Sequence, residues 1–271
     1  MLIRFYPFLI VGLVALGACR TGRDYPSPLG PRHAGVPAAA ADTSRTTTDT
    51  LRIVSFNIEF ARRIDGAIAL LKTDKALQGA DVVLLQEMDA SGTERVARAL
   101  GMGYVYYPAI HHRGTRRDFG NAVLSRWPIV EDAKLVLPHA SRYAGTHRIA
   151  TAATLRIGAS SVRVYSTHLG TVSDIGSGRR REQLRAIVAD AANYPLVVIG
   201  GDLNDANTGV VAIDAGYEWP TRSGPRTTRF GRWDHIFLKG LKSPATAAAG
   251  TVTSAGDISD HSPIWVRGIL R

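Results

Sequence analysis

The sequence predicts an α/β fold in which β-sheets pack on each other and helices cover the outside. Short apolar runs at residues 53–56, 82–85 and 196–199 end directly in polar residues. Such runs are typical of strands that are buried on both faces. Helical patterns separate these runs, and the middle of the chain is rich in strand patterns. Helices interleaved with strands around a strand-rich centre favour sheet-on-sheet packing with helices outside.

The first 18 residues have the pattern of an export signal. Residues 1–4 are short and basic, and residues 5–18 are apolar but too few to span a bilayer. The run ends in Leu16-Gly17-Ala18-Cys19, which resembles the lipobox of bacterial lipoproteins, where cleavage precedes a diacylated cysteine. We expect residues 1–18 to be a signal peptide and Cys19 to be the lipid attachment site, since several acyl chains anchor firmly. An incidental cysteine in a secretory leader is the alternative.

In lipoproteins of this type, an Arg after the cysteine, such as Arg20, implies sorting to the outer membrane. The resemblance therefore implies an exported protein held at the bacterial envelope by an N-terminal lipid anchor. Residues 19–50 are rich in Pro, Ala and Thr and lack bulky apolar periodicity. This composition predicts a disordered tether with a reach of about 30 Å, followed by one domain over residues 51–271.

The elements of that domain follow from periodicity and capping signals. A first helix is expected at residues 64–77. A second, short helix should begin at Ser91 and Glu94, which have capping-box spacing. A third is expected at 178–193, where Pro195 ends the helical pattern. The remaining strands are expected at residues 120–125, 129–137, 150–157, 162–168, 234–238 and 262–266.

Composition excludes several classes of protein. A single cysteine excludes a disulfide scaffold, and one long apolar run excludes a polytopic membrane protein. Residues 51–271 contain 28 basic and 20 acidic residues, a net charge of +8 out of +10 for the whole chain. An excess of this size indicates an anionic partner. No coiled-coil or exposed apolar repeat is visible, so a monomer is expected.

Polar residues gather where the strands end. The segments are Asn57 with Glu59, Gln86-Glu87, His168, Gly201-Asp202-Leu203-Asn204, Trp233-Asp234-His235 and Ser259-Asp260-His261-Ser262-Pro263. Acidic groups at buried strand ends are costly unless they are paired or bind a metal. Converging carboxylates suit Mg²⁺ or Mn²⁺, whereas zinc is disfavoured without cysteine ligands or paired histidines on a helix.

In this order, these motifs resemble the endonuclease/exonuclease/phosphatase superfamily, which has the deoxyribonuclease-I-like fold. The resemblance covers residues 51–267. It implies a four-layer α/β sandwich, with two mixed β-sheets packed face to face and helices on the outer faces. It also implies cleavage of phosphate esters with one or two divalent cations.

The resemblance also implies a role for each matching residue. Glu87 is the principal metal carboxylate, Asn57 lies beside it, Asp260 contributes to a metal site, and Glu59 serves a second metal or supports the first. Asp234 orients His261 as general base, and Asp202 with Asn204 positions the attacking water and stabilises the oxyanion. Whether Asp202 or His261 takes the proton of the water is open. His168 contacts the phosphate or assists the leaving group, Asn121 supports the site, and Arg148 and His235 are candidate phosphate contacts or packing residues.

The substrate is open between two classes. Arginines near the catalytic motifs, in 113–117 and 222–232, favour a nuclease-like phosphodiesterase that acts on DNA or RNA. Membrane anchoring favours a lipid-headgroup or small-molecule phosphodiesterase or phosphatase, like the sphingomyelinases and inositol phosphatases. A catalytically silent anion-binding lipoprotein is a third alternative, disfavoured because no catalytic position is substituted. The chain lacks Gly-x-Ser-x-Gly and Walker A motifs, which argues against a serine hydrolase or a nucleotide-driven enzyme.

Overall fold

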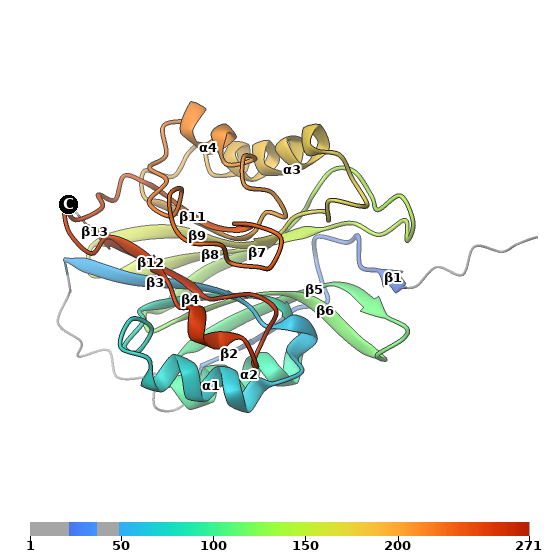
Figure 1. Cartoon of the computed structure of the whole chain (residues 1–271), viewed down its shortest axis with the longest axis horizontal. Coiled ribbons are helices and arrows are strands. Elements are labelled where there is room, and N and C mark those ends of the chain that lie inside the picture. Colours follow the sequence, from blue (N-terminus) through green and yellow to red (C-terminus); the bar gives the residue numbers. More distant parts are fainter. Residues whose placement is uncertain (1–21, 37–48, 271) are drawn as a thin grey trace, which may run out of the picture.

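The computed structural model describes residues 22–36 and 49–270, and in these ranges two sheets stack face to face between helices (Figure 1). The eight-stranded sheet has the order β1-β5-β6-β4-β3-β13-β12, and β2 also pairs with β5. The five-stranded sheet has the order β11-β10-β9-β8-β7. Each sheet contains one parallel pair, β3 with β4 and β10 with β9.

The strands are β1 Gly22–Asp24, β2 His33–Gly35, β3 Thr50–Asn57, β4 Val82–Met88, β5 Gly103–His112, β6 Arg117–Ser125, β7 Ile129–Val136, β8 Ile149–Ile157, β9 Ser160–His168, β10 Val197–Asp202, β11 Asp234–Lys239, β12 Ala249–Thr251 and β13 Ile264–Ile269. The helices are α1 Ile64–Thr73, α2 Ala90–Leu100, α3 Ser177–Asp190 and α4 Val210–Asp214, with 3-10 turns η2 Glu59–Ala61 and η3 Thr253–Ala255.

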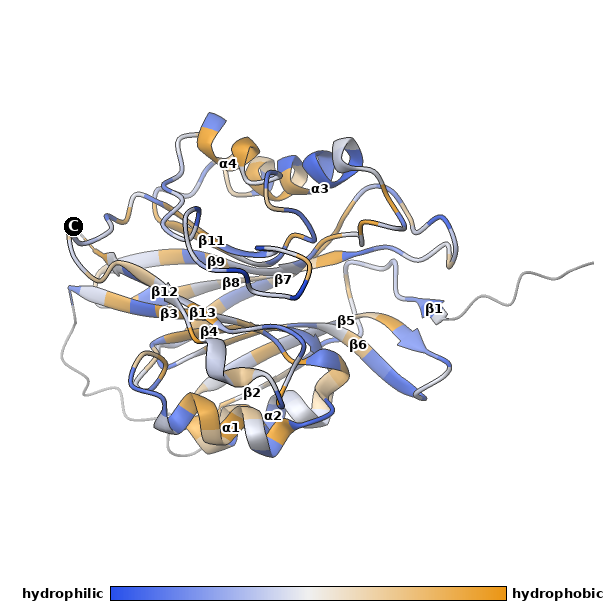
Figure 2. Cartoon of the chain, in the orientation of Figure 1, coloured by the Kyte–Doolittle hydropathy of each residue, from blue (hydrophilic) through white to orange (hydrophobic). Residues whose placement is uncertain are grey.

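The layers follow from strands whose successive side chains point to opposite faces. Ile53 packs between the two sheets, whereas its neighbour Val54 packs toward α1 and α2. In the other sheet, Val198 packs between the sheets and Ile199 packs toward α3 and α4. Three apolar cores therefore separate four layers, with hydrophobic stretches on the strands and helices that enclose them (Figure 2). The predicted four-layer sandwich is confirmed.

The helices differ from the prediction at three points, one of which is that α3 spans Ser177–Asp190 rather than residues 178–193. Helix α1 ends at Thr73 rather than at residue 77, because Asp74 is extended and its side chain accepts hydrogen bonds from the N–H groups of Ala76 and Leu77. The cap of α2 is Asp89, whose Oδ1 accepts from Gly92 N at 2.7 Å, so the capping-box assignment to Ser91 was wrong.

The disordered tether predicted for residues 19–50 is wrong for residues 22–36. This segment pairs with β5 through β1 and β2. Lys134 Nζ, buried beneath it, donates hydrogen bonds to the backbone carbonyls of Tyr25 (2.9 Å) and Gly30 (2.7 Å). Backbone pairing and buried polar contacts thus replace the apolar side chains that the segment lacks.

The remaining N-terminal predictions lie outside the described residues. These are the leader over residues 1–18, the lipid attachment at Cys19 and the part of the tether at residues 37–48. Among the helices that the structure describes, none is both long and apolar enough to cross a membrane.

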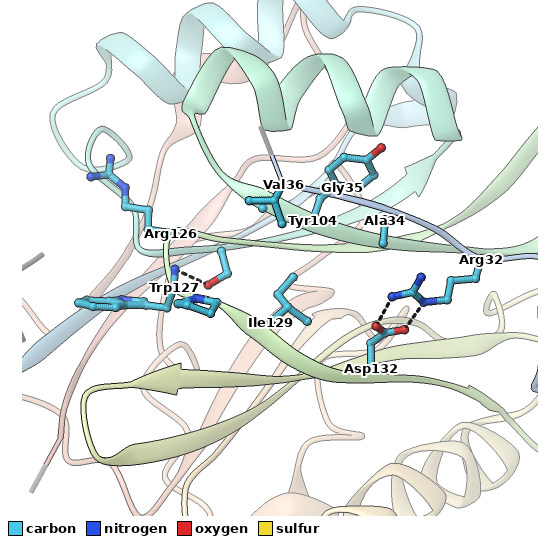
Figure 3. A pocket seen from close by; sticks show the side chains of 12 residues that line it. Arg32, Ala34, Gly35, Val36, Tyr104, Arg126, Trp127, Ile129 and Asp132 are labelled. Atoms are coloured by element: carbon cyan, nitrogen blue, oxygen red, sulfur yellow. Dashed lines mark hydrogen bonds and ion pairs between the residues drawn. The ribbon is translucent and has the colours of Figure 1, made fainter. Parts of the chain in front are cut away.

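A cavity of about 460 Å³ lies beside β2, where Val36 and Tyr104 approach Trp127 and Ile129 (Figure 3). At its edge, Arg32 makes two hydrogen bonds to the carboxylate of Asp132, at 2.7 and 2.6 Å. None of the predicted site residues lines this cavity, so it is separate from the chemistry described below.

Candidate active site

The predicted polar residues meet at one end of the two stacked sheets. In the five-stranded sheet, Asp202 at the end of β10 lies in register with His168 at the end of β9 and with Asp234 at the start of β11. In the eight-stranded sheet, Asn57 ends β3 and Glu87 lies near the end of β4. The side chain of Asn57 joins the sheets, since its Nδ2 donates to Glu87 Oε1 (3.1 Å) and to Asp202 Oδ2 (3.2 Å).

Glu87 reaches the site through an irregularity in β4. The pairing of β4 with β6 shifts register between Leu85 and Met88, and Glu87 there has φ 58°. A left-handed backbone at a residue other than glycine costs about 1–3 kcal/mol and is found mainly at functional sites. The carboxylate is held by Asn57 and by the backbone N–H of Phe60 at 3.0 Å. Burial raises the pKa of Glu87.

His261 is fixed by hydrogen bonds on both its backbone and its ring. Its N–H donates to Ser259 Oγ, which itself donates to the carbonyl of Asn57 at 2.7 Å. Its Nδ1 lies 2.8 Å from Asp234 Oδ2, which leaves Nε2 facing Asp202 Oδ2 at 3.7 Å. Burial alone lowers the pKa of His261, but the carboxylates of Asp234 and Asp202 outweigh it and raise the pKa to about 10.

Asp202 is at the centre of the cluster. Its Oδ1 accepts from the N–H of Asn204 at 2.8 Å, and its Oδ2 lies 3.3 Å from His168 Nε2. Burial raises the pKa of Asp202 to about 7, although the charge of His261 opposes the shift. Asn204 turns the chain with φ 51°, and its side chain donates to the carbonyl of Leu169. The structure thus brings together Asn57, Glu87, His168, Asp202, Asn204, Asp234 and His261.

Two further predicted residues border this cluster. Arg148 lies over the ring of Phe119 at 5.6 Å, and Glu87 and Asp202 attract its charge although burial lowers its pKa. Asn121 donates to the carbonyl of Ile149 at 2.9 Å and thereby fixes the start of β8 next to Arg148. Arg148 is placed to meet an anion, whereas Asn121 supports the site from beneath.

Three predicted residues lie outside the cluster or at its edge. His235 points away, because neighbours on a strand face opposite sides: its Nδ1 accepts from Trp219 Nε1 and its Nε2 donates to the carbonyl of Arg232. As a buried, satisfied residue it makes no phosphate contact. Glu59 forms an ion pair with Arg62. Asp260 is 69% exposed at the mouth of the site, 4.0 Å from His261 Nε2.

Two hollows flank the cluster. One, of about 180 Å³, is lined on one side by Phe60, His112 and Phe119 and reaches Arg148. The other, of about 550 Å³, contains His261 and Asp260 and is bordered by the loop that carries Arg229, Phe230 and Trp233. The two hollows share no lining residue.

A model of the endonuclease/exonuclease/phosphatase family matches residues 54–261, which include every residue of the cluster. The chain belongs to the endonuclease/exonuclease/phosphatase family. Members of this family are phosphoesterases and nucleases that generally depend on a divalent metal.

Solved structures agree with this assignment at the level of the fold. D. rerio TDP2 complexed with a single-strand DNA product shares 20% identity over 82% of this chain and 99% of its own, with a TM-score of 0.62. An endonuclease/exonuclease/phosphatase from Beutenbergia cavernae DSM 12333 shares 20% identity over 82% of this chain and 72% of its own, with a TM-score of 0.66. The human Nocturnin catalytic domain with bound sulfate shares 19% identity over 83% of this chain and 97% of its own, with a TM-score of 0.60. A comparison with curated protein sequences finds no match.

The donor set in this member of the family fits a divalent cation. Asp202 and Asp234 are buried carboxylates and the Glu87 side chain is only 12% exposed, and burial of anions without a counter-charge is unfavourable. Ligand atoms of Asp202, Asp234 and His261 lie within 4.8 Å of one another, and Asp234 Oδ1 is buried without a hydrogen-bond partner among the described residues. This group differs from the predicted set of Asn57, Glu87 and Asp260, and two of its members already bond each other.

Two residues that the sequence analysis did not single out, Thr227 and Phe60, support the site in this family member. Thr227 Oγ1 accepts from the N–H groups of Trp233 and Asp234, and the carbonyl of Thr227 accepts from Ser262 N. It therefore joins the two segments that carry the Asp234–His261 pair. Phe60 donates its backbone N–H to Glu87 and packs its ring against His112 and Phe119.

Proposed function

We propose that the chain is a divalent-metal-dependent phosphodiesterase of the nuclease type, with Mg²⁺ or Mn²⁺ as its cation. The observation that supports this most strongly is the pairing of His261 with Asp234, which leaves Nε2 facing the carboxylate of Asp202. Asn57 in turn links Asp202 to Glu87. Since the pKa of His261 is raised to about 10, the ring carries a proton at neutral pH, and its Nε2 can donate to a water or a phosphate oxygen beside Asp202.

Glu87, with Asn57 beside it, would hold the cation, because Asp234 is already committed to His261. A bound divalent cation would polarise a phosphoryl oxygen and favour the attacking hydroxide. Asp202 and His261 would orient the water, and the second hydrogen of the Asn204 side-chain amide, whose first bonds the carbonyl of Leu169, would meet the developing charge together with His168. Burial lowers the pKa of His168 well below the usual value, and its Nε2 lies 3.3 Å from Asp202 Oδ2.

DNA or RNA is the proposed substrate class, supported by the surface beside His261. Phe230 is 62% exposed and stacks on Trp233 with ring centroids 5.3 Å apart, and Arg229 lies over Phe230 at 4.4 Å. An exposed aromatic ring next to arginine is typical of surfaces that stack nucleobases. D. rerio TDP2, which shares the fold, holds a single-strand DNA product.

A substrate panel with Mg²⁺ and Mn²⁺ tests this function. The panel contains plasmid DNA, single-stranded DNA, RNA, bis-p-nitrophenyl phosphate, sphingomyelin and inositol phosphates. We expect hydrolysis of nucleic acid by the wild type, loss of hydrolysis in His261→Gln, and retention in His235→Gln, a matched change at a buried histidine outside the cluster. No turnover of any substrate with metal present would contradict the proposal.

A lipid-headgroup or small-molecule phosphoester is the second candidate. The ordered structure of residues 22–36 favours this candidate, since a lipid at Cys19 would hold the domain close to a bilayer. Preferential turnover of sphingomyelin or inositol phosphates would support this candidate over the nuclease. For the anchor itself, labelling with a tagged fatty acid is expected for the wild type and not for Cys19→Ser.

A further inference from the structure

We propose that the rim of the candidate active site docks on an anionic phospholipid surface, with the catalytic opening turned toward the bilayer. This proposal rests on the proposed lipid attachment at Cys19. It concerns the surface formed by Arg23, Arg113, Arg116, Tyr143 and Val172, called here the docking rim.

The first step is the short distance between the anchor and the fold. Only Arg20 and Thr21 separate Cys19 from Gly22, the first residue of β1. Because an extended chain spans at most about 3.6 Å per residue, Cys19 Cα lies within about 11 Å of Gly22 Cα. Acyl chains on Cys19 therefore enter the bilayer close to β1, in contrast to the 30 Å reach of a flexible tether.

The second step is that β1 cannot move away from the domain as a free arm. Asp24 accepts a hydrogen bond from His147 N at 3.2 Å, and its other oxygen lies 2.7 Å from His147 Nδ1. Tyr25 donates its backbone N–H to Ala109 and its hydroxyl to Asp118 at 3.1 Å. Since β1 pairs with β5 of one sheet and contacts the loop that leads into β8 of the other, the first described residue of the chain, Gly22, is held relative to both sheets.

The third step is that β1 lies at the end of the molecule where the site opens. Gly22 pairs with His112, the last residue before the β5–β6 turn, and the ring of His112 lies 5.7 Å from that of Phe60. Phe60 in turn donates its backbone N–H to Glu87. In Figure 1, β1 and the β5–β6 hairpin project at the same end of the molecule, and the loops that follow β7 and β9 lie above them.

The fourth step is the chemistry of the docking rim. Arg23, Arg113 and Arg116 are exposed, and this hairpin is hydrophilic in Figure 2. Tyr143 is 69% exposed and Val172 is 54% exposed on the neighbouring loops, which are joined by a hydrogen bond from Arg142 N to Asp174. Arginines with a tyrosine and an aliphatic side chain match the headgroup layer of an anionic bilayer, where basic groups meet phosphate and amphipathic rings enter the interface.

The test uses the mature lipoprotein in vesicles, with mass spectrometry of the same preparation to verify acylation. Thr115→Cys on the hairpin and Ala189→Cys on α3 are both exposed sites for a fluorophore, and acylation blocks the only native thiol. Vesicles contain equal parts of phosphatidylcholine and phosphatidylglycerol, or phosphatidylcholine alone, with a quencher on the headgroup. We expect strong quenching at position 115 and little at position 189, and more quenching with phosphatidylglycerol.

Arg113→Ser with Arg116→Ser should reduce the ratio of docked to undocked molecules about 25-fold, since each arginine at such a surface contributes about fivefold. Arg179→Ser with Arg185→Ser, an equal loss of charge from exposed positions on α3, should leave the ratio unchanged.

Equal quenching at positions 115 and 189 in acylated protein would overturn the proposal. So would a hairpin variant that docks normally but loses affinity for DNA, because the arginines would then serve nucleic acid. None of these readouts needs turnover, so a failure here is distinguishable from a failure of the proposed enzyme activity.

Discussion

Replacement of Asp234 by Asn should lower the pKa of His261 from about 10 to about 7 or below. Asp234 Oδ2 lies 2.8 Å from His261 Nδ1, whereas Asp202 and Asp260 lie 3.7 and 4.0 Å from Nε2. Burial opposes the charged ring, so loss of the nearest carboxylate leaves little to hold the proton. A fall of about three pKa units corresponds to about 4 kcal/mol.

The assay is an NMR titration of the His261 ring in metal-free protein. Because the folded pKa lies above the unfolded value of about 6.5, this charge stabilises the wild type fully below pH 6.5 and is lost as pH rises toward 10. Asp234→Asn should remove this pH dependence of stability. Asp260→Asn, at the exposed and more distant carboxylate, should change the pH dependence little. An unchanged pKa in Asp234→Asn would refute the pairing as the cause.

Three further predictions concern folding. Gly201→Ala should lower the free energy of unfolding in urea by about 3 kcal/mol or more, because Gly201 has φ 146° and an added Cβ would lie 1.8 Å from the carbonyl oxygen of Thr167. Gly178→Ala, at a position in open space on α3, should not destabilise the protein. Equal stability of the two variants would be inconsistent with this geometry. Burial lowers the pKa of His235 to about 4, so the free energy of unfolding of the wild type should fall by about 3 kcal/mol between pH 6.5 and pH 4. The decrease should be smaller in His235→Gln. If stability falls with pH in parallel in the two proteins, His235 is not the cause. Lys134→Ala should speed hydrogen exchange in residues 22–36 more than in β9, and a uniform change across both would contradict its local role.

Much of the fold could be predicted because its strands are buried on both faces. The runs at 53–56 and 82–85 lie within observed strands, and the run at 196–199 does so from Val197 onward, since such apolar runs have few alternatives. Strand β5 escaped prediction because Pro108 interrupts its pattern, and in the structure the pairing with β6 shifts register at that point. The ordered structure of residues 22–36 depends on contacts with Lys134 and Asp132, which lie 100 or more residues away along the chain, and local composition cannot reveal such contacts.

The candidate site was predictable where it follows from strand ends. Asp202, His168 and Asp234 lie in register because polar residues at neighbouring strand ends meet at one edge. His235 could have been excluded from sequence, since it neighbours Asp234 on a strand and so faces the other side. The left-handed backbone of Glu87 and the joining role of Thr227 arise from tertiary packing and have no signal in the sequence.

The most direct test is the Mg²⁺ dependence of phosphodiester hydrolysis in the wild type, Glu87→Gln and Glu59→Gln. Glu87 accepts from both Asn57 and Phe60 at the centre of the site, whereas Glu59 pairs with Arg62 outside it. We predict that Glu87→Gln lowers kcat by a factor of about 10³ and weakens Mg²⁺ activation, and that Glu59→Gln leaves both near wild type. Normal, Mg²⁺-activated turnover in Glu87→Gln would contradict the assignment of this cluster as the catalytic metal centre.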